Sequence, residues 1–240
     1  MMNECSLADP PQIDRATEQA HKAVIQALRS GERRVPRNSQ LLRLNEAGPR
    51  LRTLISGWAF RCRTFSDGRR QIIGVLLPGD TFGIESLFCD GPDCLVWSAT
   101  VVTYAVMDPD ATMQLFDAEP WFRRRLMRAL ADDKAESEQW MAQLGQCDAE
   151  ERTAALLLLL HERLRARNMT SHNTFRLELT QQELADLLGL HLIHLNRILS
   201  RLRARGLIMM NGQEVTLLDP DGLGDLVPVP GQFARANDPL

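Results

Sequence analysis

Apolar positions in the last third of the chain repeat with the periods of two short helices. The first set is spaced for one helix face and comprises Leu184, Leu187 and Leu188. The second set recurs at intervals of three and four residues and comprises Leu195, Ile198, Leu199 and Leu202. Thr180 and Glu183 have the spacing of a capping box, which marks a helix start, and Gly189 can adopt the positive φ at which helices end. The pattern predicts two packed helices joined by a tight turn.

The face of the second helix opposite its apolar stripe is polar and basic. It carries Ile193, Asn196, Arg197, Ser200 and Arg201. The segment from His191 to Arg205 contains four arginines and no acidic residue. A short helix that packs on a partner and leaves arginines exposed meets the requirement for insertion into a DNA major groove. An ordinary amphipathic helical pair with a solvated basic face shows the same spacing, and this alternative stays open.

A β-hairpin is predicted directly after these helices. Two apolar runs flank the dipeptide Asn211-Gly212, and Asn-Gly between apolar runs is a strong hairpin signal. Upstream, an apolar helix over 149–167 is followed by a polar stretch, 168–174, that we interpret as a loop. Two helices followed by a hairpin predict a winged helix-turn-helix domain over 148–218.

The first half of the chain alternates short, strand-like apolar runs with turn signals. Asp67-Gly68 is a hairpin signal, and a second turn at 78–80 separates further runs. Several short strands at regular spacing favour a small β-roll, or double-stranded β-helix, over 35–118. Such a roll encloses a pocket in which a small ligand can bind. An N-terminal helical segment over 1–34 is expected to precede it.

A long helix is predicted over 119–147, because Pro120 can occupy the first helical position and no proline follows it there. Its apolar positions approximate a coiled-coil stripe and are Phe122, Leu126, Ala129, Trp140 and Leu144. Asp133 and Glu136 interrupt this stripe, so it either packs on its own domain or forms the seam of a dimer. The predicted fold class is α+β: a β-roll sensor domain, a long central dimerisation helix and a C-terminal winged helix-turn-helix, followed by a mobile tail over 219–240.

Composition narrows the class of protein. An apolar content of 44% and a charged content of 25% are typical of a globular protein. No apolar run approaches the roughly 18 residues that cross a bilayer, and residues 1–30 lack the pattern of a signal peptide. We therefore expect a cytoplasmic protein with no membrane partner and with its five cysteines reduced. The net charge of −3 hides nine arginines against five acidic residues over 151–208, and DNA association depends on such local patches.

Three motifs in the first half accompany the winged domain. They are Leu54-Ile55-Ser56-Gly57-Trp58, Asp67-Gly68-Arg69-Arg70-Gln71-Ile72 and Leu77-Pro78-Gly79-Asp80-Thr81-Phe82-Gly83. With these motifs in this order, the chain resembles the Crp/Fnr family of bacterial transcription regulators over about 30–218. The resemblance implies a homodimer that binds pseudo-palindromic double-stranded DNA, contacts RNA polymerase and is switched by a signal at the roll.

The resemblance also implies which side chains meet DNA. Base contacts fall on Ile193, Asn196 and Arg197 of the second helix, with His194 at its edge. Arg197 matches the arginine that family members direct at O6 and N7 of a guanine. Ile193 stands where a glutamate is common, and Leu192 replaces another polar contact, so the half-site is expected to differ there. Phosphate contacts are expected at Thr180, Gln182, His191, Ser200 and Arg201.

By the same resemblance, an effector pocket comprises Gly83, Ile84, Glu85, Cys94 and Leu95. Members that bind cyclic AMP carry a glutamate directly after the last glycine of a Gly-Asp-x-x-Gly turn, and later an Arg-Ser or Arg-Thr pair. Here Ile84 follows that glycine, and Cys94-Leu95 replaces the pair. A cyclic phosphate without its cationic partner loses a charge-assisted interaction. We therefore expect no cyclic nucleotide in the usual mode, and the effector is unknown.

No cofactor is predicted. Oxygen-sensing members hold an iron–sulfur cluster with closely spaced N-terminal cysteines, whereas this chain has only Cys5 there and four scattered cysteines, Cys62, Cys89, Cys94 and Cys147. Convergence of four thiolates stays open as an alternative, as does haem, although all five histidines lie outside the predicted roll. Cys89 and Cys94 flank a turn-prone loop, where a thiol switch and two ordinary side chains are both open.

Two further functions stay open. One is a constitutive regulator that senses no effector and is controlled by its abundance. The other is a cupin-like metal enzyme, which needs histidines clustered inside the roll; no histidine occurs between Val35 and Asp108. Neither a phosphate-binding glycine loop nor a nucleophile elbow is present, so no metal site and no enzyme is predicted. The sequence indicates a DNA-binding regulator and does not reveal its operator or whether target genes rise or fall.

Overall fold

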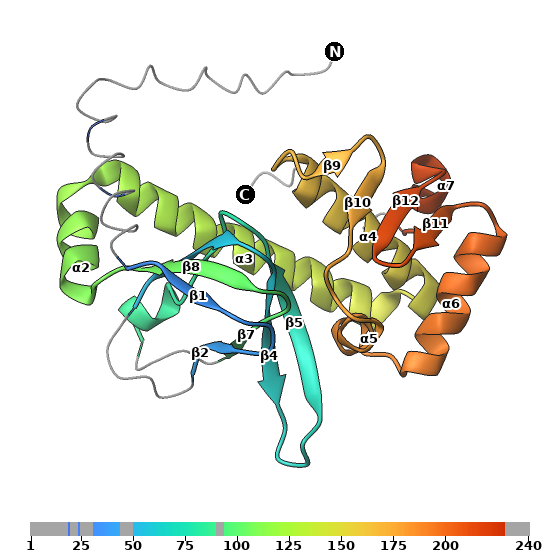
Figure 1. The fold of residues 1–240 in the computed structure, drawn as a ribbon, viewed down its shortest axis with the longest axis horizontal. Helices are drawn as coiled ribbons and strands as arrows, with labels where there is room; N and C mark the ends of the chain where they lie inside the picture. Colours follow the sequence, from blue (N-terminus) through green and yellow to red (C-terminus); the bar gives the residue numbers. More distant parts are fainter. Residues whose placement is uncertain (1–18, 20–23, 25–30, 44–49, 90–93, 229–240) are drawn as a thin grey trace, which may run out of the picture.

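The computed structural model describes residues 19, 24, 31–43, 50–89 and 94–228, which form two domains joined by a long helix (Figure 1). The N-terminal domain is a roll of short strands. These strands are β1 (Arg33–Val35), β2 (Gln40–Leu42), β3 (Arg52–Ser56), β4 (Ala59–Thr64), β5 (Arg70–Leu76), β6 (Thr81–Phe82), β7 (Leu95–Ser98) and β8 (Val102–Val106), with the 3-10 helix η1 (Glu85–Leu87) between β6 and β7. Most of the predicted N-terminal segment over 1–34 lies outside the described residues.

The roll consists of two four-stranded antiparallel sheets, ordered β1-β8-β3-β6 and β2-β7-β4-β5. Apolar side chains from both sheets, including Leu54 and Val96, meet in a buried core. Gly57 connects β3 to β4 with a φ of +81°, and a Cβ there would lie 2.2 Å from the carbonyl oxygen of Val101. Only glycine fits this turn, which explains its place in the first of the three motifs.

Two helices, α2 (Pro109–Ala118) and α3 (Pro120–Gln146), lead from the roll to the C-terminal domain, and α4 (Ala149–Arg165) is the first helix of that domain. The helix α2 was not anticipated from sequence; Asp108 caps it by accepting from the N–H groups of Asp110 and Ala111. The helix α3 occupies the predicted long segment and begins with Pro120. A capping box between Asp148 and Glu151 starts α4.

The C-terminal domain is a winged helix-turn-helix, as predicted. Its central helices are α5 (Gln181–Leu188) and α6 (Leu192–Ala204), and its wing contains β11 (Ile208–Asn211) and β12 (Glu214–Leu217). Gly212 turns the wing hairpin with a φ of +61°, which agrees with the Asn-Gly signal.

The stretch 168–174 differs from its interpretation as a loop. It contains β9 (Thr170–Ser171) and the start of β10 (Thr174–Arg176), which extend the wing sheet to the order β11-β12-β10-β9. The physical reason is Phe175, which is buried and pairs across the sheet with the buried Val215. Burial of Phe175, which directly follows the polar stretch, therefore stabilises part of that stretch as strands of the sheet.

The tail also begins differently from the expected mobile segment over 219–240. A short helix, α7 (Pro220–Gly224), follows the wing, and the side chain of Asp219 caps it. Leu223 is fully buried in the winged domain, so its burial stabilises this helix. Residues 229–240 lie outside the described residues.

The largest apolar core crosses the boundary between the domains. Trp58, Phe60 and Ile72 of the roll belong to the same buried cluster as Leu184 and Leu188 of α5. Figure 1 shows the long β4–β5 hairpin beside α5. Because these apolar side chains leave water together, the roll and the first helix of the helix-turn-helix are docked on each other.

Candidate nucleic-acid interface

Local interactions build the turn between α5 and α6. The hydroxyl of Thr180 accepts a hydrogen bond from the N–H of Glu183 (3.1 Å), and the carboxylate of Glu183 accepts one from the N–H of Thr180 (2.7 Å). Gly189 ends α5 with a φ of +66°, a left-handed conformation that favours glycine. These contacts confirm the predicted capping box and helix stop, and they set the direction in which α6 begins.

The helix α6 presents one side to solvent at the edge of the molecule (Figure 1). Its apolar stripe is buried, as predicted. On the opposite side, Ile193 exposes 69% of its surface, Arg197 and His194 are exposed, and Asn196 is half-buried. Within the part of the chain that the structure describes, the Arg197 side chain has no hydrogen-bond or ion-pair partner. The four residues expected to read bases therefore lie together on one accessible side.

The residues expected to contact phosphate lie mainly at helix starts. Thr180 is the N-cap residue of α5 and His191 that of α6. Gln182, in the first turn of α5, donates to Asp186 (2.7 Å), and the hydroxyl of Ser200 accepts from a neighbouring arginine (3.0 Å). The first turns of helices carry free N–H groups that bind anions, so this placement suits contact with a DNA backbone.

Arg201, also expected at a phosphate, already has a carboxylate partner. Glu150 of α4 accepts hydrogen bonds from Arg201 (2.5 Å) and from Arg205 (2.7 Å). Only 13% of the Glu150 side chain is exposed. No sequence motif marked Glu150, because it precedes Arg201 by 51 positions. Its one sequence signal is membership of the acidic first turn of α4.

Side chains of the roll hold α5 near both of its ends. Near its start, the guanidinium of Arg37 donates to both carboxylate oxygens of Glu183, each at 2.6 Å. Near its end, Arg70 pairs with the carboxylate of Asp186 (2.6 Å), and the amide of Gln71 donates to the Asp186 carbonyl (2.6 Å). The last carbonyls of a helix lack partners within it, so Gln71 completes the end of α5. These bonds orient the helix-turn-helix on the roll.

An ionic cluster joins the Gly-Asp turn of the roll to α3 and α4. The carboxylate of Asp80 accepts from the N–H of Leu77 (2.8 Å), from Arg163 (2.7 Å) and from Arg167. Arg163 also donates to Glu136 of α3 (3.1 Å). Charge-assisted bonds of this kind are stronger than neutral ones, so the turn, the long helix and the first helix of the winged domain are held together at one point.

The expected effector residues, Gly83, Ile84, Glu85, Cys94 and Leu95, lie in and beside η1 and at the start of β7. Ile84 is buried in a core cluster with Leu51 and Met107, and Cys94 is buried as well. A buried isoleucine offers no acceptor to a ribose hydroxyl, and a thiol offers no cation to a cyclic phosphate. These residues do not fit a cyclic nucleotide bound in the usual mode.

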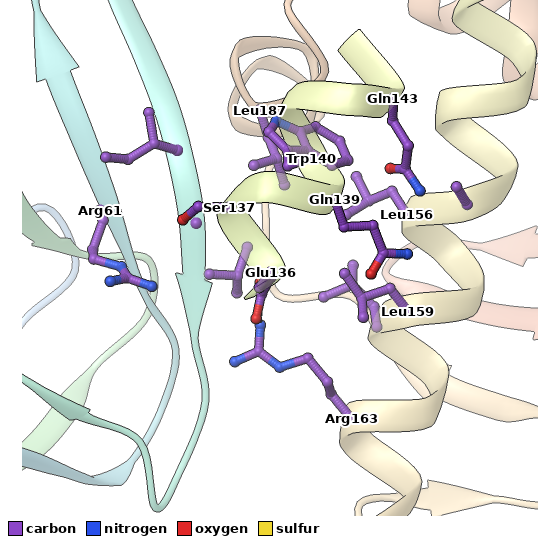
Figure 2. Close-up of a pocket in the computed structure, with 15 residues that line it drawn as sticks. Arg61, Glu136, Ser137, Gln139, Trp140, Gln143, Leu156, Leu159, Arg163 and Leu187 are labelled. Carbon is purple, nitrogen blue, oxygen red and sulfur yellow. The ribbon is translucent and has the colours of Figure 1, made fainter. Parts of the chain in front are cut away.

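A small cavity lies between β5, α3 and α4 (Figure 2). Its volume is about 40 Å³, and Arg61, Trp140 and Arg163 are among the residues that line it. Among the described residues, the Nε of Arg61 and the Nε1 of Trp140 are buried without a hydrogen-bond partner. A cavity of this size has room for a few water molecules, which could accept from these donors, and none for a nucleotide.

The guanidinium of Arg61 joins the roll to α3. It donates to both carboxylate oxygens of Asp133, each at 2.8 Å. Its partner across the β4–β5 ladder is Gly74, where a Cβ would lie only 3.3 Å from the Arg61 Nε. Burial by itself lowers the pKa of Arg61, but the bond to Asp133 and nearby negative charges raise it, and the net direction is upward. The Arg61 guanidinium therefore stays charged where the roll meets α3.

The expected dimer stripe of α3 divides between its own chain and solvent. Phe122 and Leu126 are buried in the core beneath the helix, and Trp140 packs on the core that crosses the domain boundary. Ala129 is half-buried, and Leu144 is exposed. Most of this stripe is therefore used within the chain.

A neighbouring side of α3, which shares Leu144 with this stripe, carries apolar side chains at heptad spacing. We call it the α3 seam, and it comprises Met127, Leu130, Lys134, Ser137, Met141 and Leu144. Met127 and Met141, which are separated by two heptads, expose 45% and 63% of their surfaces. Spacing alternately by three and four residues is the pattern of helices that pair along their length.

Four cysteines lie in the described ranges and form no disulfide with one another: Cys62, Cys89, Cys94 and Cys147. Cys5 and the loop 90–93 lie outside the described residues. Within the described ranges, no group of three His, Cys, Asp or Glu side chains is placed to hold a metal ion. No helix in these ranges is long and apolar enough to cross a membrane.

Two family models match the two domains. A cyclic nucleotide-binding domain matches residues 32–119, and a Crp-like helix-turn-helix domain matches residues 151–226. The first range covers the roll with α2, and the second covers the winged domain with α7. The order of the two matches is the order of the predicted domains.

Several similar proteins are transcription regulators. The transcriptional activator protein FnrL of Cereibacter sphaeroides is 31% identical over 67% of this chain, and the match spans 65% of that protein. The CRP-like cAMP-activated global transcriptional regulator of Mycobacterium tuberculosis is 31% identical over 78% of this chain and 84% of its own length. This class of relatives agrees with the prediction that the chain is not an enzyme.

The fold has counterparts among solved structures. FixK2 from Bradyrhizobium japonicum superposes with a TM-score of 0.75, at 24% identity, over 83% of this chain and 98% of that one. That likeness concerns the fold. With both domain models matched and a 31% identical relative covered over 84% of its length, the chain belongs to the Crp/Fnr family of regulators, as its motif order predicted.

Proposed function

We propose that this protein is a transcription regulator that binds a pseudo-palindromic DNA operator as a homodimer in the cytoplasm. The observation that carries the proposal is the accessible side of α6, on which Arg197 is exposed and has no partner among the described residues. The planar fork of an arginine can donate to O6 and N7 of one guanine. Asn196 and His194 lie beside it, and the exposed Ile193 is available to a thymine methyl group.

Backbone contacts position such a helix in the groove without reading sequence. The starts of α5 and α6, with Thr180, Gln182 and His191, supply N–H groups and polar side chains for phosphate oxygens. Ser200 lies on the exposed side of α6. Arg201 is treated separately below, because its guanidinium is paired.

The α3 seam supports pairing of two copies. Its two exposed methionines and Leu144 form an apolar strip that a second α3 can cover. Lys134 and Ser137 occupy the middle of the seam, and polar residues at such positions lower the stability of a helical pair while they define its register. Two parallel copies would present their α6 helices to successive major grooves, which are about 34–36 Å apart.

The signal that controls the protein is unassigned, and so is any cofactor. The effector residues around Ile84 and Cys94 are packed, whereas the Arg61–Asp133 pair lines a hollow of about 430 Å³ between the roll and α3. The burial of Ile84 and Cys94 favours a second candidate, a constitutive regulator without an effector. The description of FnrL as a transcriptional activator supports contact with RNA polymerase.

Selection from a random pool of duplexes tests the proposal. The full chain should enrich a palindromic site and bind it with an affinity that falls as salt rises between about 50 and 200 mM. Sedimentation should give a dimer. Absence of binding to any duplex at the lowest salt would rule out DNA regulation. A thermal shift with cyclic nucleotides or haem would argue against the constitutive candidate.

A further inference from the structure

One acidic side chain of α4 engages two arginines of α6. Glu150 accepts from Arg201 and Arg205 at 2.5 and 2.7 Å. The carboxylate is 13% exposed, whereas Arg201 and Arg205 are 59% and 45% exposed. The carboxylate is therefore sheltered from water, while the two guanidinium groups lie at the surface beside it.

These arginines continue a line that starts at the base-reading end of α6. Ile193, Arg197 and Arg201 follow one another at four-residue steps along α6, so each lies beside the next, and Arg205, the C-cap residue, comes four residues later. Arg197 is free among the described residues, whereas the next two members of the line are paired with Glu150. The basic face predicted from sequence is thus divided into one available cation and two occupied ones.

Glu150 is held in place by its own helix start. The side chain of Asp148 accepts from the N–H groups of Glu150 (2.7 Å) and Glu151 (2.9 Å), and Glu151 accepts from the N–H of Asp148 (2.6 Å). This capping box fixes the backbone that carries the carboxylate. A DNA phosphate must compete with a pre-positioned anion for the same guanidinium groups.

We propose that Glu150 withholds Arg201 and Arg205 from DNA phosphates and so determines how far the protein prefers its operator over other DNA. Phosphate neutralisation supplies affinity for any sequence, whereas base contacts supply discrimination. Because Arg201 and Arg205 are paired with Glu150, binding to DNA of any sequence is weak, and the contact of Arg197 with a base determines which sequence is bound. This inference rests on the proposed function of α6 in DNA binding.

The test compares full-length wild type with Glu150→Gln on a random-sequence duplex, measured by fluorescence anisotropy between about 50 and 200 mM salt. Each additional phosphate contact steepens the slope of log affinity against log salt by about 0.9. Glu150→Gln is expected to bind random DNA more tightly and to steepen the slope by about 0.9 to 1.8. Its preference for the operator over random DNA should fall in parallel.

Glu162→Gln is the matched control, because Glu162 is an exposed acid on the same helix and removal of its charge changes the net charge equally. It should keep the wild-type slope. A Glu150→Gln slope equal to that of this control would overturn the proposal, as would weaker binding to both kinds of DNA, which would assign Glu150 a merely supporting role.

A triple variant, Glu150→Gln with Arg201→Gln and Arg205→Gln, decides the question even if the single variant fails to fold. It should show the wild-type slope, because neither arginine contacts phosphate in the wild type. A shallower slope would show that the arginines already bind DNA. If the wild type binds no duplex at low salt, the proposed function fails; if it binds and these slopes disagree, only this inference fails.

Discussion

The Nη2 of Arg37 in the roll donates to both carboxylate oxygens of Glu183 in α5, each at 2.6 Å. The same carboxylate accepts from the N–H (2.7 Å) and hydroxyl (2.9 Å) of Thr180. One buried group therefore caps the first helix of the helix-turn-helix and fastens it to the sensor domain. A shift of the segment that carries Arg37 must act directly on the start of α5.

Replacement of this carboxylate should weaken both the cap and the docking. Glu183→Gln is expected to lower the free energy of unfolding by about 2 kcal/mol, since bonds to a charged group contribute about 1.5–3 kcal/mol. Urea titration of the full chain measures the change. Glu162→Gln, at an exposed position of α4, should change the stability little. If the two substitutions lowered the free energy of unfolding equally, Glu183 would neither cap α5 nor hold it on the roll as proposed.

Loss of the free guanidinium on α6 should affect the operator more than other DNA. Arg197→Gln is expected to weaken operator binding roughly tenfold to a hundredfold, because a bidentate base contact contributes about 1–3 kcal/mol. Competition against random DNA measures the discrimination. Arg165→Gln removes an equal charge from the exposed end of α4 and should leave discrimination unchanged. A uniform loss on all sequences would reassign Arg197 to phosphate contact.

The α3 seam should control assembly without controlling folding. Met141→Glu places a charge in the proposed contact between two copies and is expected to raise the dimer dissociation constant at least about tenfold, or about 1.4 kcal/mol. Sedimentation velocity measures the assembly state. Ala142→Glu introduces the same charge at the next exposed position, off the seam, and should remain dimeric. If Met141→Glu and Ala142→Glu had the same dimer dissociation constant, the α3 seam would not be the interface.

Replacement of Asp133, the partner of Arg61, should lower the free energy of unfolding, whereas replacement of the adjacent Asp132 should not. Asp133→Ala leaves the guanidinium, 21% exposed, beneath α3 without its ion pair, and we expect a loss of about 2 kcal/mol in unfolding free energy. Asp132→Ala removes a carboxylate that pairs with Arg128 on the open surface and should have no measurable effect. Both substitutions change helix propensity equally, so thermal or urea unfolding isolates the ion pair. Similar unfolding free energies for the two variants would show that the Arg61–Asp133 ion pair does not stabilise the contact between the roll and α3.

Alkaline pH should destabilise the fold through Cys62. Burial raises the pKa of this thiol, with Arg70 lowering it and Asp186 raising it by smaller amounts. Because the folded-state pKa exceeds the unfolded value, the related stability is present below the ordinary value of 9.0 and is lost as pH rises through the folded pKa. Stability should therefore fall less steeply above pH 9.0 in Cys62→Ala than in the wild type. The exposed Cys89 provides the control, since Cys89→Ala should keep the wild-type slope.

Much of the DNA-binding element follows from the sequence alone, because its signals are local. The capping box of Thr180 and Glu183, the left-handed Gly189 and the Asn-Gly turn each act within a few residues. The buried stripe of α6 is equally local, since its period places those leucines on one face whatever they contact. These local features are sufficient to predict the winged helix and its exposed arginine.

Tertiary structure decided which partner each face receives. Periodicity showed that α3 has apolar sides, but it could not show that Phe122 and Leu126 are covered by the chain itself while Met127 and Met141 remain exposed. The pairing of Glu150 with two arginines of α6 likewise joins residues far apart in sequence. Local patterns determine how the backbone coils, whereas burial and charge pairing depend on neighbours that only the folded chain brings together.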